Sequence, residues 1–278
     1  MFGSGTVFRP LFPAERFVCL CEKEKKQMNT LFACLPCYNE EENIIPLTLG
    51  WLEQEEALKK EGFSLQVVAI DDKSTDSTKE KISQLEREHP QVHLVAHEKN
   101  MNLGGGVNTA VTYFLQHGVP GDLCVLMDGD NTHDPKYVHS MIQAVRRGAD
   151  VVIASRYQGG AEVHGVPRHR LLLSDGAKLY YSLMLRVPKV KDYTCGYRAY
   201  TYQSLQRARK KYGDQLITQR SFACMMELLY KLYRSGCRFD EVPFSLRYDN
   251  KGGESKMRVL RTMKDSLKTA WQLRRGKI

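Results

Sequence analysis

Two aspartates one residue apart are the clearest candidates for chemistry in this sequence. Asp128 and Asp130 flank Gly129 and follow the apolar run at residues 123–127. Carboxylates with this spacing at the end of a buried strand can both reach one hard divalent cation, and Mg²⁺ or Mn²⁺ prefers oxygen ligands and often bridges phosphate oxygens. A solvated turn is the alternative, because Asp and Gly favour turns. We predict that Asp128 and Asp130 hold a metal that offsets charge on a departing diphosphate.

A second acidic pair follows another apolar run, at residues 65–70. Asp71 and Asp72 come directly after that run, where a carboxylate can accept hydrogen bonds from a ribose or a base edge. Asp76 falls near the start of a helix predicted over residues 74–89, where negative charge is favourable. We therefore expect Asp71 and Asp72 to face a ligand and Asp76 to be structural.

Three glycines, Gly104 to Gly106, open a helix predicted over residues 104–117. Glycines let the backbone approach a phosphate, and a helix N-terminus favours anions. The run is not a P-loop, because no Gly-Lys-Ser/Thr follows. Phosphate binding at Gly104 and Gly105 is one interpretation, and close packing of the helix on a sheet is the other.

These polar positions share one place in the predicted fold. The predicted strands are residues 31–36, 65–70, 92–96, 123–127 and 151–154, and the predicted helices are residues 40–61, 74–89, 104–117 and 135–147. This alternation predicts an α/β fold with a mostly parallel sheet covered by helices on both faces. Ligands bind outside the carboxyl ends of such strands, which is where the polar motifs fall.

The second half of the sequence is less regular. Residues 158–169 carry three glycines and a proline and predict a loop, a candidate lid. Helices are predicted over residues 171–186 and 219–235, and a strand over residues 239–248.

The length of 278 residues fits one large α/β domain, or one domain with appendages. No apolar run approaches the ~18 residues of a membrane-spanning helix, and the N-terminus lacks the pattern of a signal peptide. The eight cysteines predict buried, reduced thiols of a cytoplasmic protein. Cys34 and Cys37 have zinc-ligand spacing, but no second pair follows, so we do not expect zinc.

The excess positive charge lies at the C-terminus. Of a net charge of +9, residues 251–278 hold nine Lys and Arg against two acidic residues. A helix predicted over residues 255–275 has apolar residues at Leu260, Met263, Leu267 and Trp271 and basic residues on its other faces. Such a helix suits an anionic membrane surface, or it packs on the sheet with its charges solvated. We do not expect nucleic-acid binding, because aromatic residues do not alternate with basic ones along a sheet.

Taken together, the motifs resemble family 2 glycosyltransferases, and within them the dolichyl- and polyprenyl-phosphate sugar synthases. The matching segments are residues 35–41, 70–76, 102–106 and 127–135, within a resemblance that covers about residues 31–258. It implies a GT-A fold with a Rossmann-like sheet and a nucleotide diphosphate sugar, GDP-mannose or UDP-glucose, as donor. The implied donor-binding residues are Pro36, Tyr38, Asn39, Glu40, Asp71, Asp72, Gly104, Gly105, Asp128 and Gly129.

The resemblance also implies an acceptor site in the second half. Arg170 and Ser174 match the Arg-x-x-x-Ser of this branch, fourteen residues beyond Arg156, and Lys256 ends its Gly-x-Ser-Lys motif. These four residues are expected to hold the acceptor phosphate, since Arg forks match phosphate oxygens and a hydroxyl adds a donor. A surface salt bridge is the alternative for any single Arg.

The sequence departs from this branch at three places. The lid has no Trp, and Asn250 stands where an Arg is usual, with Arg247 or Lys251 as candidates to replace it. Thr132 stands at the position of a possible third metal ligand. These departures bear on the identity of the donor sugar and the acceptor.

We therefore predict an inverting hexose transfer to a polyprenyl or dolichyl phosphate, with Asp128, Asp130 and Arg156 as catalytic residues. A phosphate acceptor is already ionised and needs no strong base, whereas an alcohol would need one, Asp130 or Asp192. Transfer to a soluble or saccharide acceptor is the alternative, but neutral sugars do not call for two arginines.

The predicted organisation has three parts. Residues 1–29 form an irregular N-terminal segment, residues 30–250 the GT-A catalytic domain and residues 251–278 the basic amphipathic helix. The expected location is the cytoplasm, with peripheral association at the cytoplasmic face of a membrane.

Overall fold

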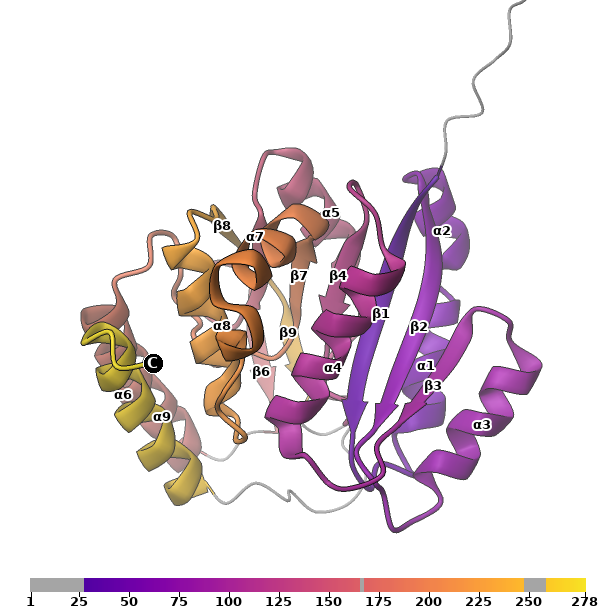
Figure 1. Ribbon diagram of the computed structural model, residues 1–278, viewed down its shortest axis with the longest axis horizontal. Helices are drawn as coiled ribbons and strands as arrows, with labels where there is room; N and C mark the ends of the chain where they lie inside the picture. The colour runs from indigo at the N-terminus through magenta and orange to yellow at the C-terminus, as the bar shows by residue number, and fades with distance from the viewer. Residues whose placement is uncertain (1–27, 166–167, 248–258) are drawn as a thin grey trace, which may run out of the picture.

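The computed structural model describes residues 28–165, 168–247 and 259–278, and a seven-stranded sheet forms its centre (Figure 1). The strand order is β3-β2-β1-β4-β7-β5-β8. Its strands are β1 (Asn29–Cys37), β2 (Phe63–Asp71), β3 (Val92–Ala96), β4 (Leu123–Leu126), β5 (Val151–Ser155), β7 (Arg198–Thr201) and β8 (Phe239–Pro243). All neighbouring strands run parallel except β7, which is antiparallel to β4 and β5. The predicted α/β class with a mostly parallel sheet is confirmed.

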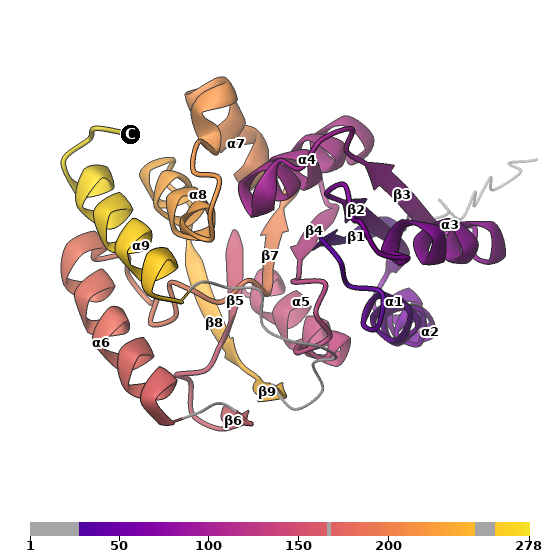
Figure 2. The same ribbon diagram turned by 90° about the horizontal axis from the view of Figure 1, so that it is seen from below.

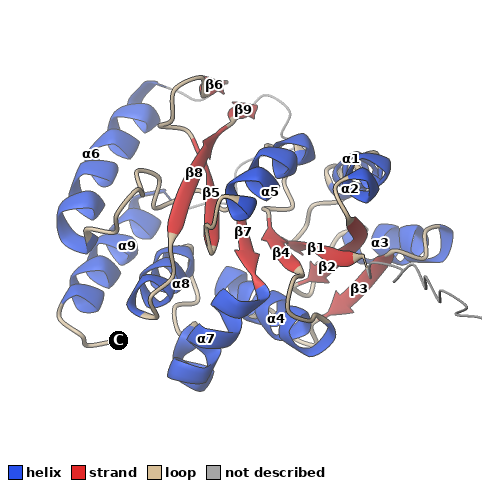
Figure 3. Ribbon diagram, turned by 90° about the horizontal axis from the view of Figure 1, so that it is seen from above, coloured by secondary structure: helices blue, strands red, loops and turns tan. Residues whose placement is uncertain are grey.

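Helices cover both faces of the sheet (Figure 3). One face carries α1 (Ile44–Leu52), α2 (Glu55–Lys60) and α5 (Val138–Arg146), which follows the 3₁₀ turn η1 (Pro135–Tyr137). The other face carries α4 (Asn102–His117), α7 (Tyr202–Tyr212) and α8 (Ala223–Arg234), with η2 (Gly213–Leu216) between α7 and α8, and α3 (Thr78–Glu88) lies near β3. This double cover explains why the interior strands are almost continuously apolar.

Two further helices pack together beyond β8 (Figure 2). They are α6 (Arg168–Leu185) and α9 (Val259–Arg274), and α9 also contacts α8. A small second sheet pairs β6 (Glu162–His164) with β9 (Ser245–Arg247) in parallel. Part of the predicted loop at residues 158–169 is therefore a strand and the first turn of a helix.

Several predicted elements are divided in the structure. The predicted helix at residues 40–61 is two helices, and the predicted strand at residues 239–248 is β8 and β9, which belong to different sheets. The helix predicted over residues 74–89 begins only at Thr78, because the preceding backbone is hydrogen-bonded to loop side chains such as Asp71 and Asn39.

Strand β7 and helix α7 were not predicted from the sequence. β7 begins with Arg198, whose side chain is completely buried. Its Nη1 donates to the Met225 carbonyl at 2.6 Å and its Nη2 to the Tyr193 carbonyl at 2.8 Å. A buried charged residue whose hydrogen-bond partners lie outside its own strand hides a short interior strand from pattern analysis.

The remaining expectations concern the termini and the thiols. The six cysteines within the described residues are buried and form no disulfide, as predicted; Cys19 and Cys21 lie outside those residues, as does nearly all of the predicted segment 1–29. Among the helices described, none is both long enough and apolar enough to cross a bilayer.

Candidate functional site

The two acidic pairs lie on the same edge of the sheet. Strand β1 separates β2 from β4, and Cys37 at the end of β1 pairs with Asp71 at the end of β2. A Cβ added to Gly129 would lie 3.0 Å from the Cβ of Cys37, so the loop after β4 packs directly on β1. With adjacent strands about 4.8 Å apart, the two pairs are separated by about 10 Å. This distance suits opposite ends of one nucleotide-sized ligand.

Asp128 is positioned by Gly196, a residue of the second half. A Cβ added to Gly196 would lie 2.6 Å from Oδ2 and 2.7 Å from Oδ1 of Asp128. The half-buried carboxylate therefore lies against the bare Cα of a glycine, and any side chain there would displace it. Gly196 is not among the site residues predicted from the sequence, because its contact with Asp128 depends on the fold.

Asp130 is oriented by its own loop. Its Oδ1 accepts the hydroxyl of Thr132 at 2.7 Å, and Thr132 is only 4% exposed. The residue considered as a third metal ligand thus directs its hydroxyl to the second aspartate. The described residues contain no group of three His, Cys, Asp or Glu side chains arranged around one point. Two aspartate carboxylates of this kind fit a hard cation that completes its shell with phosphate oxygens and water.

The loops after β1 and β2 hold each other through predicted donor residues. The backbone amide of Asn39 donates to Ser74 Oγ at 2.9 Å, and the side-chain Oδ1 of Asn39 accepts from the backbone amide of Thr75 at 2.8 Å. The Glu40 amide donates to Thr78 Oγ1 at 2.8 Å. Asn39 has a φ of 55°, a left-handed conformation that Asn tolerates better than most residues. Asn39 and Glu40 therefore build the wall of the site, where Pro36 is half-buried and Tyr38 is exposed.

Asp71 and Asp72 are buried and bonded to the protein. Asp71 accepts the Ser74 amide through both oxygens, at 3.2 and 3.3 Å. Asp72 Oδ1 accepts the Met101 amide at 2.7 Å and lies 2.7 Å from His97 Nδ1. Asp72 thereby links the end of β2 to Met101, the residue before α4. Both carboxylates, which were expected to face a ligand, thus already accept hydrogen bonds from the protein.

The glycines of α4 are explained by close packing. A Cβ on Gly104 would lie 1.9 Å from the Gln219 carbonyl oxygen, and one on Gly105 would lie 2.2 Å from the Cβ of Met101. The Gly104 amide donates to the Arg220 carbonyl at 3.0 Å. The Gly104 amide thus has a protein partner, and donor binding at Gly104 and Gly105 remains a prediction.

Arg156 is held by a buried carboxylate. Its Nε and Nη2 each donate to Asp192 at 2.8 Å, and Nη2 also donates to Thr194 Oγ1 at 2.7 Å. Burial acts to raise the pKa of Asp192, but the charge of Arg156 and its hydrogen bonds outweigh that effect and lower the pKa to about 2. The Arg156 side chain remains 20% exposed, and its charge is balanced by that of Asp192.

The other predicted acceptor residues are only partly visible. Ser174 is half-buried on α6. The Arg170 side chain and Lys256 lie outside what the structure describes, so their predicted phosphate contacts remain predictions.

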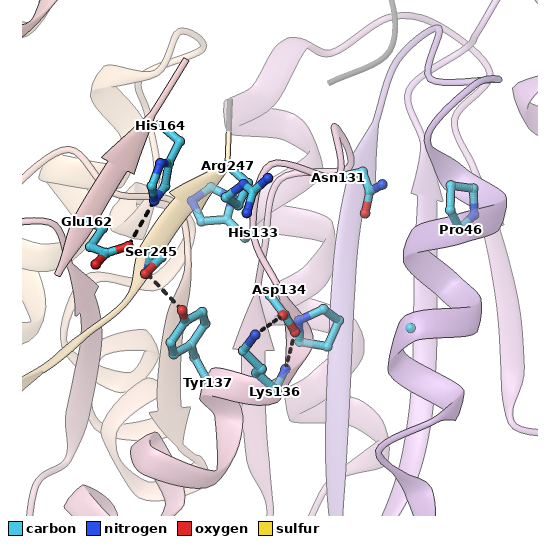
Figure 4. Close-up of a pocket in the computed structure, with 12 residues that line it drawn as sticks. Pro46, Asn131, His133, Asp134, Lys136, Tyr137, Glu162, His164, Ser245 and Arg247 are labelled. Atoms are coloured by element: carbon cyan, nitrogen blue, oxygen red, sulfur yellow. Dashed lines mark hydrogen bonds and ion pairs between the residues drawn. The ribbon is translucent and has the colours of Figure 1, made fainter. Parts of the chain in front are cut away.

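A pocket of about 400 Å³ lies beside the loop that follows Asp130 (Figure 4). Within its lining, Lys136 Nζ lies 2.6 Å from Asp134 Oδ2, and His164 Nε2 lies 2.9 Å from Glu162 Oε2. The Arg247 amide donates to the Thr132 carbonyl at 3.2 Å. Arg247, a candidate to replace the arginine absent at position 250, is thus bonded to the loop that carries Asp130. None of the predicted donor residues lines this pocket.

Solved glycosyltransferases share this fold. The chain matches glucosyl-3-phosphoglycerate synthase from Mycobacterium tuberculosis, in complex with Mn²⁺, UDP and glucosyl-3-phosphoglycerate, with a TM-score of 0.60 and 17% identity, covering 98% of this chain and 87% of the other. It matches the mannosyltransferase PcManGT from Pyrobaculum calidifontis, in complex with GDP-Man and Mn²⁺, with a TM-score of 0.52 and 15% identity, covering 88% and 69%. The likeness supports the predicted GT-A fold.

Three curated proteins are similar in sequence. Undecaprenyl-phosphate mannosyltransferase from Micrococcus luteus is 32% identical over 223 residues, covering 80% of this chain and 85% of that protein. Dolichol-phosphate mannosyltransferase from Pyrococcus furiosus is 31% identical, covering 81% and 58%, and polyprenol monophosphomannose synthase from Mycolicibacterium smegmatis is 30% identical, covering 80% and 79%. The profile of glycosyl transferase family 2 matches residues 32–231. The chain belongs to glycosyl transferase family 2.

Proposed function

We propose that this protein transfers a hexose, mannose or glucose, from a nucleotide diphosphate sugar to a polyprenyl phosphate, with inversion at the anomeric carbon. The names of its relatives support a mannosyl donor and a polyprenyl phosphate acceptor. The observation that carries the proposal is the contact between Asp128 and Gly196, which joins the acidic motif of the first half to the segment that holds Arg156.

The first half supplies the donor site. The edge between Asp71 and Asp128 accommodates a nucleotide at one end and its diphosphate at the other. A divalent cation held by Asp128 and Asp130 would offset the negative charge on the departing diphosphate. Pro36, Tyr38 and Gly129 would contact the donor, and a Cβ on Gly129 would lie 3.1 Å from the Pro36 carbonyl oxygen.

The second half supplies the acceptor site. A phosphate oxygen of the acceptor forms a bond to the anomeric carbon while the bond from that carbon to the diphosphate oxygen breaks. The attacking phosphate is ionised at neutral pH, so no residue has to remove a proton. Asp192, with a pKa of about 2 and both oxygens bound by Arg156, is poorly suited to act as a base, which leaves Asp130 as the candidate base for an alcohol acceptor.

We further propose that α6 and α9 contact the membrane in which a polyprenyl phosphate resides. The buried face of α9 consists of Ser266, Thr269, Ala270 and Leu273, whereas Trp271 is 39% exposed beneath the Arg275 guanidinium, 4.0 Å from its ring centroid. On α6, Leu179 is 64% and Leu183 57% exposed. Exposed leucines on α6, and an exposed tryptophan beside a basic residue on α9, suit the interface of an anionic bilayer.

The transfer proposal is tested with a panel of labelled nucleotide sugars, Mg²⁺ or Mn²⁺, and a polyprenyl phosphate. Label from one donor should enter the lipid phase, and omission of the metal or the lipid phosphate should abolish transfer. Label transferred only to a soluble sugar would support the alternative acceptor and contradict the proposal.

The membrane proposal is tested by flotation with anionic and neutral liposomes. The double variant Leu179→Asp and Leu183→Asp should lose flotation with anionic liposomes. Leu49→Asp is the matched control, because Leu49 is 40% exposed on α1, at the other end of the sheet. Equal flotation of both variants would exclude the α6 surface.

A further inference from the structure

Arg156 brings little uncompensated positive charge to the proposed acceptor site. Arg156 donates two bonds to Asp192, whose side chain is completely buried, so the pair brings no net charge to an incoming phosphate. A phosphate monoester carries close to two negative charges at neutral pH. We propose that Lys178 on α6 is a ligand of the acceptor phosphate, an inference that rests on the proposed function.

Lys178 lies next to the residues already assigned to the acceptor. Its Nζ is 4.0 Å from the ring centroid of Tyr157, and the Arg156 Cζ is 5.7 Å from the same centroid. Ser174 precedes Lys178 by four residues on α6, so the two share one face of that helix. Tyr157 thus connects the strand end that carries Arg156 with the face of α6 that carries Ser174 and Lys178.

The charge of Lys178 is available to a ligand. Within the described part of the chain, no carboxylate forms an ion pair with it, although Asp175 is only three residues away. Its aromatic neighbour does not offset the charge, because burial raises the pKa of Tyr157 to about 12 and keeps the phenol neutral. The ring attracts the ammonium group weakly and leaves its three N–H donors capable of binding oxygens.

The chemistry of lysine suits this position. An ammonium group on a flexible stem is a compact charge that follows a phosphate as it changes position during transfer, whereas the Arg156 fork is fixed by Asp192. Lys178 would therefore supply the charge, Arg156 a directed N–H group and Ser174 a hydroxyl. Sequence comparison alone did not single out Lys178, because it lies outside the Arg-x-x-x-Ser motif.

The test measures the KM for each substrate separately in three variants. Lys178→Met keeps the length of the side chain and removes its charge, and Lys178→Arg restores the charge. Lys189→Met is a control that removes the charge of an exposed lysine after α6. Loss of one charged hydrogen bond should raise the KM for a polyprenyl phosphate about ten- to a hundredfold in Lys178→Met. The KM for the nucleotide sugar and the thermal midpoint should stay at wild-type values, and Lys178→Arg should recover most of the loss.

Two results would overturn the role of Lys178. An unchanged KM for the lipid phosphate in Lys178→Met would remove it from the site. If Lys178→Met instead raises both KM values in parallel and lowers the thermal midpoint, Lys178 contributes to folding through its contact with Tyr157. A wild-type protein that binds the nucleotide sugar but transfers it to no polyprenyl phosphate would instead contradict the proposed function, so the two failures are distinguishable.

Discussion

The donor half and the acceptor half of this protein organise their polar residues differently. In the donor half, Asn39, Asp71 and Asp72 bind nearby loops through backbone amides and hydroxyls, so the wall of the site is a network of short neutral or charge-assisted bonds. In the acceptor half, Arg156 depends on one completely buried carboxylate, Asp192. Among the described residues, the donor wall therefore has many partial supports, whereas Arg156 of the acceptor wall is held by one ion pair with Asp192 and one bond to Thr194.

This contrast suggests a division of tasks. A nucleotide diphosphate is bound at several points and suits a rigid edge, whereas a lipid phosphate has to enter, react and leave as a charged product. The two halves meet where the Asp128 carboxylate lies against Gly196. Substitutions at these two residues should have the largest effect on sugar transfer.

Asp128→Ala removes the carboxylate at this meeting point. We expect sugar transfer to fall by about a thousandfold, because charge on the leaving diphosphate is no longer offset. The circular dichroism spectrum should not change, since Asp128 is half-buried at the sheet edge and outside the core. A variant that retains more than a tenth of wild-type activity would separate the acidic motif from catalysis.

Gly196→Ala keeps the carboxylate but displaces it. The new Cβ would lie 2.6 Å from Asp128 Oδ2, and a displacement of this kind should lower kcat by about a hundredfold. Gly159→Ala is the matched control, because a Cβ there meets no atom within 4 Å. Similar activity of the two variants would show that the position of Asp128 against Gly196 has no role in transfer.

Asp192→Asn tests the dependence of the acceptor half on one pair. Removing one charge of a buried pair should lower the free energy of unfolding by about 3 to 5 kcal/mol, and transfer should be lost as Arg156 moves. In the donor wall, the matched variant Asn39→Ala should lower the free energy of unfolding, measured with urea, by less than half as much. Equal losses would remove the contrast between the halves.

The same pair predicts a pH dependence. The pKa of Asp192 is about 2 in the folded protein, below its ordinary value of 3.8, so its contribution to stability is complete above about pH 4 and is lost as the pH falls through 2. The difference in unfolding free energy between wild type and Asp192→Asn should therefore shrink by about 2 kcal/mol between pH 5 and pH 2. A difference that is constant across this range would contradict a strong ion pair.

Gly176→Ala should have the smallest effect, and a stabilising one. Gly176 is exposed within α6, and a Cβ there meets no atom within 4 Å. Alanine should raise the unfolding free energy by about 0.5 to 1 kcal/mol without changing the KM for either substrate. A changed KM for the lipid phosphate would indicate that flexibility of α6 contributes to acceptor binding.

The sequence predicts the donor half better than the acceptor half, for a physical reason. Interior parallel strands are almost continuously apolar, so β1, β2 and β4 and the acidic residues that follow them stand out as short apolar runs ending in charge. Their convergence on one edge follows from the parallel arrangement alone. In the donor half, the apolar runs in the sequence therefore predict where the acidic residues lie in the fold.

The rest depends on contacts between residues far apart in the chain. Strand β7 carries a buried arginine that no apolar pattern reveals, and Gly196 lies 68 positions from the aspartate it accommodates. Gly104 is ambiguous in the sequence, where it fits phosphate binding or close packing, and only the structure shows how closely it approaches residues 219–220. Lys178 is recognisable only once Tyr157 places it beside Arg156.

Calorimetric titration of GDP and UDP with and without Mn²⁺, in wild type and Asp128→Ala, tests the central claim most directly. If the carboxyl edge between Asp71 and Asp128 is one diphosphate site, one nucleotide binds to wild type more tightly with Mn²⁺, and this gain disappears in Asp128→Ala. Absence of nucleotide binding to wild type under saturating Mn²⁺, or an equal gain in both proteins, would contradict the account.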